Sequence, residues 1–264
     1  DIHLGRANAN KLMFRFLKEA VRDYGARLSS IDGGSVRNAI PREAFAIITI
    51  PGDNVEALWE LVSDYQEMYR SEYKGIEHNI NFTAEMTDMP ATLIPEEIQD
   101  DLINAIEGCQ NGVISMLVDF PGTVESSTNL AIVKSSNEMI EIQILVRSSS
   151  ESRKEAVCSS LESIFSLAGA KVEYSDGYGG WQPNIDSPIL KIMQQAYLDL
   201  YGKKPEAKVM HAGLECGIIQ ESYPDMDMIS IGPDLQHPHS PDERVSIPSV
   251  ARTWDFIVTT LARI

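Results

Sequence analysis

Long apolar runs, cysteine and basic charge are all scarce in this sequence. No apolar run approaches the roughly 20 residues that a membrane helix needs, and no charged-then-apolar leader opens the chain. The three cysteines, Cys109, Cys158 and Cys216, are too few and too widely spaced for a disulfide framework or a cysteine-rich zinc site. We therefore expect a cytoplasmic protein with reduced thiols and no membrane partner.

Basic residues are outnumbered, with 22 Lys and Arg against 39 Asp and Glu, which gives a formal charge of −17. Nucleic acids and anionic membrane surfaces both require a basic footprint, and the basic residues here are scattered along the chain. The sequence therefore argues against both partners. With 264 residues, of which 43% are hydrophobic, the chain can bury the core of one or two domains.

The first two thirds of the chain alternate between helix and strand patterns. Apolar residues at helical spacing predict helices over residues 8–24, after 53, after 95 and over 151–167. Segments rich in β-formers predict strands over 44–50, 78–86, 113–118, 128–133, 139–147 and 171–174. Because most of these strands are spaced as hairpins, we expect an α+β domain over residues 1–175, with helices packed on one face of a sheet.

A cluster of Gly and Pro between residues 176 and 188 marks the expected domain boundary. After it, the sequence predicts helices and strands in alternation, over 188–201, 208–210, 214–222, 226–231 and 248–264. This order is typical of an α/β layer. The 176–264 segment is too short for a complete enzyme sheet.

Two segments near the end of the chain have features of a functional site. Lys208-Val-Met-His211 leads into Ala212-Gly-Leu-Glu-Cys-Gly217, a strand pattern that opens into a helix N-terminus, where free backbone N–H groups favour an anion. Gly232-Pro-Asp-Leu-Gln-His-Pro-His239-Ser-Pro-Asp-Glu243 follows and presents His239 on a Pro-punctuated loop. A loop histidine is most often a surface residue, but neutral imidazole held at the end of a sheet is a good zinc ligand.

These two segments resemble the closing metal-ligand region of the zinc-dependent peptidases of the aminoacylase and glutamate carboxypeptidase type. Further segments in the same order are similar to that family, namely Gly5–Lys11, Gly33–Gly34, Arg37–Ala44 and Gly180–Pro183. The family's first-half signatures are absent, and the chain opens at Asp1 without Met. The resemblance implies the second half of a longer enzyme, with a lid domain over 1–175 and the C-terminal part of an α/β zinc-peptidase catalytic domain over 176–264.

The resemblance makes His239 the last ligand of a two-metal site. It implies two Zn²⁺ ions per active site in the full-length parent, of which this chain carries an incomplete site. A single histidine would suit Mn²⁺ or Co²⁺ equally well. His237 is two residues away and is expected in solvent or at the rim of the site rather than as a ligand. Asp242 and Glu243 are expected to cap or orient the loop.

The expected substrate contacts come mainly from the lid. Arg147 closes an apolar strand and could be a plain edge-strand charge in water, but by resemblance its guanidinium binds a substrate carboxylate in bidentate fashion. Asn38 could merely satisfy a turn, but by resemblance its amide hydrogen-bonds a substrate carbonyl or a tetrahedral oxyanion. Asn129 is a third lid candidate for substrate binding.

By resemblance, the turn that contains Gly213 also faces the substrate. Its backbone N–H groups would help to bind the terminal carboxylate, and a glycine permits close approach. His211 and Glu215 flank this turn and are expected to support the site from behind. Local hydrogen bonds would explain the histidine equally well, and the helix dipole would explain the glutamate.

The activity implied by the resemblance is hydrolysis of Xaa-His dipeptides by metal-activated water, with a glutamate base that is not in this chain. We therefore expect the chain to be inactive alone. Two alternatives stay open: a related two-metal tripeptidase, deacylase or carboxypeptidase, and a non-catalytic binding or dimerisation module formed by residues 1–175. Exposed sheets in such lids can pair between subunits, so a homodimer is one expected assembly.

Overall fold

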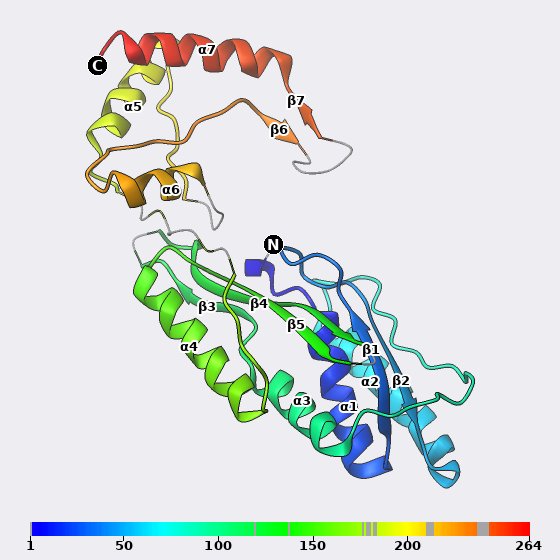
Figure 1. Cartoon of the computed structure of the whole chain (residues 1–264). Helices are drawn as coiled ribbons and strands as arrows, with labels where there is room; N and C mark the ends of the chain where they lie inside the picture. The colour runs from blue at the N-terminus through cyan, green and yellow to red at the C-terminus, as the bar shows by residue number, and fades with distance from the viewer. Residues whose placement is uncertain are drawn as a thin grey trace. The chain divides into compact units, whose positions relative to one another are not determined.

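The computed structural model describes residues 2–118, 120–136, 138–175, 177, 181, 184–209, 214–236 and 243–264. The chain forms two compact units, Asp1–Ser175 and Asp176–Ile264, called unit 1 and unit 2 below (Figure 1). Each unit has a hydrophobic core of its own. Among the described residues, no helix has the length and apolar character that crossing a membrane requires.

The helices of unit 1 form where apolar residues recur at helical spacing. In the described residues they are α1 (Ala9–Tyr24), α2 (Val55–Glu72), α3 (Glu96–Gly108) and α4 (Glu151–Leu167), with short 3₁₀ turns at Ile2–Leu4 and Gly52–Asn54. Asn8 caps α1, since its Oδ1 accepts the Lys11 N–H at 3.1 Å. Gly25 ends the helix at φ 73°, a left-handed conformation that glycine adopts without strain.

The strands of unit 1 form one antiparallel sheet with β4 at its centre. Its members are β1 (Arg27–Gly33), β2 (Ala44–Thr49), β3 (Gly112–Met116), β4 (Val124–Ser135) and β5 (Ile140–Ser148). The order is β2-β1-β4-β3, and β5 pairs with β4 (Figure 1). On one edge of β4, residues Ser126 to Ser135 pair with β5. The opposite edge is shared, with β3 pairing at 124–128 and β1 only at 133–134.

All four of these helices contribute to one core beneath the sheet. Ile31 of β1 and both Leu130 and Val133 of β4 belong to this core, together with Phe14 and Leu17 of α1, and each is at most 1% exposed. α2, α3 and α4 add buried side chains to the same cluster. Unit 1 is therefore an α+β fold in which the helices share the core under one face of the sheet.

The strand predicted over residues 78–86 is wrong. Ile80 and Phe82 do pack against the core, as their alternation indicates. Their backbone, however, bonds to side chains of α2: the Phe82 N–H donates to Gln66 Oε1 at 3.1 Å, and the Ile80 carbonyl accepts from Arg70 Nε at 2.8 Å. An alternating pattern reports burial of one side of a segment, which an irregular chain fixed by neighbouring side chains can also achieve.

Two other differences concern short segments of unit 1. Residues 171–174 were predicted to be a strand and form none, whereas β1 forms over a segment for which no strand was predicted. Val172 nevertheless packs against the core. Five of the seven residues of β1 are Arg, Ser, Asp or Gly, and its pairing with β2 compensates for weak β-propensity.

The described part of unit 2 consists mainly of helices. They are α5 (Pro188–Tyr201), α6 (Glu215–Ser222) and α7 (Ile247–Leu261), with a small hairpin of β6 (Leu235–Gln236) and β7 (Arg244–Val245). The helices match the prediction closely. The strand predicted over 226–231 is absent, and 208–209 form none, while residue 210 lies outside the described residues. No described strand lies beside either segment to pair with it.

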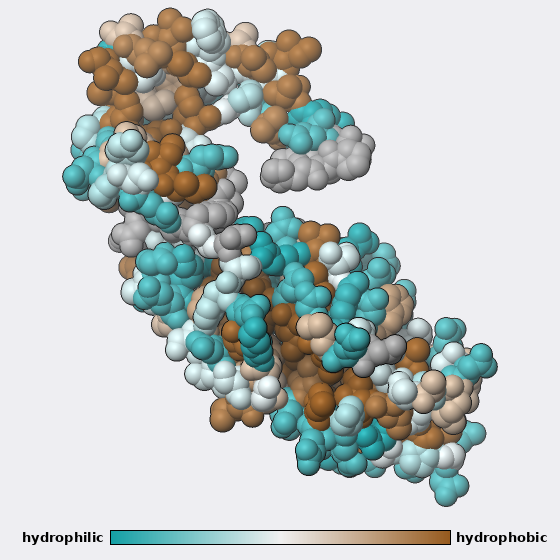
Figure 2. Space-filling model, viewed as in Figure 1, coloured by the Kyte–Doolittle hydropathy of each residue, from teal (hydrophilic) through white to brown (hydrophobic). Residues whose placement is uncertain are grey.

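The core of unit 2 is small for the apolar content of its helices. Its buried members are Met193, Ala196 and Phe256. On α7, Ile247 is 82% exposed and Trp254 is 66% exposed, and Figure 2 shows hydrophobic surface over α5 and α7. The described residues of unit 2 therefore leave much apolar helix surface uncovered.

Candidate functional site

Part of the β4 edge has no described strand beside it, and asparagine side chains bond to it instead. This stretch lies between the pairings with β3 and β1. The Leu130 N–H donates to Asn111 Oδ1 at 2.8 Å, and the Leu130 carbonyl accepts from Asn8 Nδ2 at 3.0 Å. Asn10 Nδ2 donates to the Ala131 carbonyl at 3.5 Å. These three side chains, Asn8, Asn10 and Asn111, are called the asparagine seam below; they satisfy backbone groups that would otherwise be buried without partners.

The loop that carries Asn38 joins β1 to β2 and is closed by backbone hydrogen bonds. Gly34 begins the loop in the left-handed region, with φ 75°. Its N–H donates to the Glu43 carbonyl at 3.2 Å. The Pro41 carbonyl accepts the N–H of the first residue of α1 at 3.0 Å. Both ends of this segment, residues 34–43, are thus bonded to other parts of unit 1; it is called the Asn38 loop below. Asn38 is exposed in the turn between the two ends.

Side chains hold the middle of the Asn38 loop on both sides of Asn38. Asn129 is only 7% exposed, and its Nδ2 donates to the Ala39 carbonyl at 2.7 Å. On the other side, Arg37 Nη1 donates to Ser175 Oγ at 3.0 Å in an exposed contact. Both neighbours of Asn38 in the sequence, Arg37 and Ala39, therefore have a hydrogen bond to another part of unit 1.

Arg147 lies on the same face of the sheet as Asn129. In the pairing of β4 with β5, Arg147 stands opposite Ser127, which is two residues before Asn129. Residues that are opposite or two apart share a face, and the intervening residues, such as buried Thr128, point to the other face. Arg147 is half-buried. The structure thus brings the Asn38 loop, Asn129 and Arg147 to one side of the sheet.

The remaining predicted site residues are in unit 2. Glu215 is the first residue of α6 and is exposed. His239, His211 and Gly213 lie outside the described residues, so their roles stay predictions.

Sequence reasoning missed the asparagine seam. The helix pattern beginning at residue 8 gave Asn8 a role only as the start of α1, which it also fills. Asn10 is fully buried. The available signal was a second asparagine in the first turn of an amphipathic helix, since buried polar residues are the informative exceptions in a core.

A family model described as Peptidase family M20/M25/M40 matches residues 45–263. The chain belongs to this family. A further model, described as the peptidase dimerisation domain of M20 proteins, matches residues 1–77 and so covers α1, β1, β2 and α2. The resemblance read from the motifs is confirmed.

Two relatives of this M20 chain match it over its whole length. The cytosol non-specific dipeptidase of Escherichia coli strain K12 is 40% identical over 264 residues, which are 100% of this chain and 54% of the relative. The crystal structure of an aminoacylhistidine dipeptidase from Vibrio alginolyticus is 42% identical, with a TM-score of 0.92, and is covered to the same extent, 100% and 54%. The M20 chain therefore spans about half the length of both.

Among the described residues of the M20 chain, no group of three or more His, Cys, Asp and Glu side chains is arranged to hold a metal ion. His239, the predicted ligand, is outside them. The described side chains therefore do not form a metal site by themselves.

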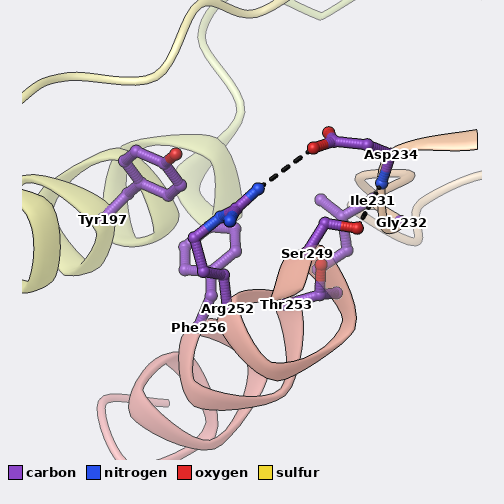
Figure 3. Close-up of a pocket in the computed structure, with 8 residues that line it drawn as sticks. All are labelled: Tyr197, Ile231, Gly232, Asp234, Ser249, Arg252, Thr253 and Phe256. Atoms are coloured by element: carbon purple, nitrogen blue, oxygen red, sulfur yellow. Dashed lines mark hydrogen bonds and ion pairs between the residues drawn. The ribbon is translucent and has the colours of Figure 1, made fainter. Parts of the chain in front are cut away.

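A pocket of about 220 Å³ lies between α5 and α7 in unit 2 of the M20 chain (Figure 3). Arg252 pairs with Asp234 at 3.0 Å, and the Asp234 N–H donates to Ser249 Oγ at 2.9 Å. Tyr197 and Phe256 line the apolar side, edge to face with their centroids 5.2 Å apart. The polar groups hold the segment before β6 against α7, and no predicted site residue lines the pocket. We assign it a structural role.

The cysteines of the M20 chain are free thiols. Burial raises the pKa of the Cys109 thiol and, less deep in unit 1, that of Cys158. Both are therefore protonated at neutral pH, whereas a nucleophilic cysteine needs a lowered pKa.

Proposed function

We propose that this chain is the C-terminal half of a cytosolic, zinc-dependent dipeptidase that hydrolyses Xaa-His dipeptides. The observation that carries the proposal is similarity at 40% and 42% identity, over 100% of the chain, to two proteins named as dipeptidases. One is named for aminoacylhistidine substrates, and the other is named as a non-specific enzyme of the cytosol. Because the chain covers 54% of each relative, the activity is assigned to a full-length parent.

Unit 1 would be the lid that recognises the peptide. Arg147 is half-buried at the end of a paired strand, which supports a guanidinium held in one place for a substrate carboxylate. Asn38 is exposed on a loop fixed at both ends, so its amide Nδ2 is available to donate to the scissile carbonyl or to the oxyanion that develops from it. Both contacts orient the peptide rather than break its bond.

Unit 2 would be the closing part of the catalytic domain. His239 is proposed as a metal ligand, and the turn at Gly213 as a backbone contact to the substrate carboxylate, with His211 and Glu215 supporting it. When bound, a pair of Zn²⁺ ions, or Mn²⁺ or Co²⁺ in their place, supplies an activated water and a polarised carbonyl.

Hydrolysis of a peptide panel by the full-length enzyme tests this function. We expect Xaa-His dipeptides to be cleaved and tripeptides to be poor substrates, because the carboxylate bound by Arg147 would lie one residue from the scissile bond. A chelator should remove the activity and added zinc should restore it. Preferred cleavage of tripeptides or N-acyl amino acids would instead support a related tripeptidase, deacylase or carboxypeptidase.

The 264-residue chain alone is expected to bind zinc weakly and to hydrolyse no Xaa-His dipeptide. The reason is that it carries a single predicted ligand and lacks the predicted glutamate base. Isothermal titration with zinc and a peptidase assay check this, and zinc-dependent turnover by the chain alone would contradict it.

We further propose that β2 is the surface through which the protein forms a homodimer. β2 lies at the edge of the sheet in the described residues and within the segment that matches a dimerisation domain. Its Phe45 is 63% exposed and its Ile47 is 40% exposed. An open strand edge with apolar side chains is a ready surface for pairing with a second copy.

Replacing Phe45 and Ile47 together with lysine is expected to weaken this dimer by at least about 30-fold, the factor that corresponds to one interface hot spot. Two buried charges facing their symmetry mates would repel each other across the interface. Sedimentation equilibrium measures the change. Leu167→Lys is the matched control, since Leu167 is 88% exposed at the end of α4 and should leave the dimer intact.

A further inference from the structure

We propose that Asn129 is a positioning residue that determines the position of Asn38. It acts through its hydrogen bond to the Ala39 carbonyl, and a hydrogen bond from Asn8 orients its own amide. This inference rests on the proposed function insofar as Asn38 contacts the substrate. It gives Asn129 a role different from the direct substrate contact that the sequence predicts.

The amide of Asn129 is used at both ends inside unit 1. Its Nδ2 donates to the Ala39 carbonyl at 2.7 Å, and its Oδ1 accepts from Asn8 Nδ2 at 3.4 Å. With an exposure of only 7%, the side chain has little surface left for a ligand. Its contacts therefore connect the Asn38 loop to the start of α1.

Asn8 has one orientation available because all its polar atoms are bonded. Its Oδ1 accepts the Lys11 N–H, so its Nδ2 is the donor to Asn111 Oδ1 at 3.1 Å and to the Leu130 carbonyl at 3.0 Å. The longer contact to Asn129 Oδ1, at 3.4 Å, shares one of these two hydrogens. Asn8 is 3% exposed. Since Asn8 presents a donor to Asn129, the Oδ1 of Asn129 turns toward Asn8 and its Nδ2 toward Ala39.

The bond to Ala39 is the main restraint on the middle of the loop. The Ala39 N–H donates to the Val36 carbonyl at 3.2 Å, which shapes the turn but does not connect it to the sheet. The bond from Arg37 to Ser175 is exposed, so water competes for both partners. The Asn129 bond is short and partly buried, and its acceptor, Ala39, is the residue next to Asn38.

The substitution Asn129→Asp tests this geometry because it replaces only the side-chain NH₂ group, by an oxygen. The carboxylate keeps an oxygen for the bond from Asn8 but replaces the donor to Ala39 with a second oxygen, which repels the carbonyl at 2.7 Å. The Ala39 backbone must move, and Asn38 moves with it. Asn129→Ala, which removes the donor without adding charge, is the second variant if the first folds poorly.

The first experiment is a double-mutant cycle in the full-length enzyme with an Xaa-His substrate. We expect Asn129→Asp to lower kcat/KM by roughly 10- to 100-fold in the Asn38 background, as a misplaced contact does. In an Asn38→Ala background, the same change should lower it by less than about 3-fold, because the group being positioned is gone. Equal losses in both backgrounds would overturn the proposal, since Asn129 would then act on the substrate directly or on the fold in general.

Thr128→Val is the matched control. Thr128 is fully buried beside Asn129 on β4, and its Oγ1 donates to the Gln110 carbonyl at 2.7 Å, away from the Asn38 loop. Loss of this buried bond should lower stability by an amount similar to the Asn129 change while leaving kcat/KM within about 3-fold. A loss of kcat/KM equal to that of Asn129→Asp would overturn the proposal.

A second measurement does not depend on activity. In the ¹⁵N-labelled 264-residue chain, Asn129→Asp should lower the backbone order parameters of residues 37–39 from about 0.85 toward 0.6, while those of α2 stay unchanged. Unchanged values at 37–39 would overturn the proposal. If the full-length enzyme cleaves no dipeptide, the proposed function fails, and the order parameters alone decide whether Asn129 positions the loop.

Discussion

His239→Ala in the full-length enzyme is expected to lower kcat/KM for an Xaa-His dipeptide by about 1,000-fold or more. A metal ion contributes several kcal/mol of transition-state stabilisation, and each 1.36 kcal/mol is about tenfold in rate. A site that loses an imidazole ligand holds its metal less tightly and in altered geometry. Steady-state kinetics and the zinc content of the purified variant, measured by mass spectrometry, check both effects.

His237→Ala is the control for this substitution. His237 is two residues before His239 and is expected in solvent or at the rim of the site rather than as a ligand. We therefore expect His237→Ala to retain zinc and to keep kcat/KM within about 3-fold, the scatter expected of a surface change. If the two variants lose activity equally, or if His239→Ala retains full activity and zinc, His239 is not the ligand.

Gly34→Ala is expected to destabilise the 264-residue chain by about 3 kcal/mol or more. Two costs add at this position. Gly34 has φ 75°, which a residue with a Cβ adopts only with strain. In addition, the new Cβ would lie 1.9 Å from the carbonyl oxygen of Ala131 and 3.2 Å from the Cβ of Pro41. Because this carbonyl belongs to the backbone of the central strand β4, moving it away would disturb the pairing of the sheet.

Gly75→Ala separates these two costs. Gly75 has φ 87°, but no atom lies within 4 Å of the position that its Cβ would take. It should therefore show only the backbone strain, about 1 kcal/mol. Urea unfolding followed by circular dichroism gives the two free energies of unfolding. Equal midpoints for Gly34→Ala and Gly75→Ala would mean that the approach of β1 to β4 is looser than the structure indicates.

The helices of this chain were predictable from sequence because their evidence is local. The residues of α1, α4 and α5 repeat apolar side chains every three or four positions, and start or stop residues stand at their ends. The strands were less predictable from sequence. β5 has strong alternation and was found almost to the residue, whereas β1 is paired on both sides but contains few β-formers. Partner strands, which a local pattern does not report, decide such cases.

The candidate site residues were predicted from the family resemblance, whereas the contacts that hold them in place were not predicted. Asn38 and Arg147 stand in segments that the family resemblance picks out. Asn8 contacts Leu130, which is 122 residues later in the chain, and nothing near Asn8 in the sequence indicates that partner. A residue that acts by supporting another can be recognised only once the fold has brought the two together.

The asparagine seam also has a consequence for the order in which unit 1 folds. The β1–β2 hairpin and the β3–β4–β5 meander each join strands that are close in sequence, while backbone pairing between the two is confined to Asp32 with Lys134 and Gly33 with Val133. Contacts between distant parts of a chain require closure of a long loop and form later than local ones. Each half of the sheet can therefore form from contacts that are local in sequence, and the side-chain amides of the seam join the two halves in a later step.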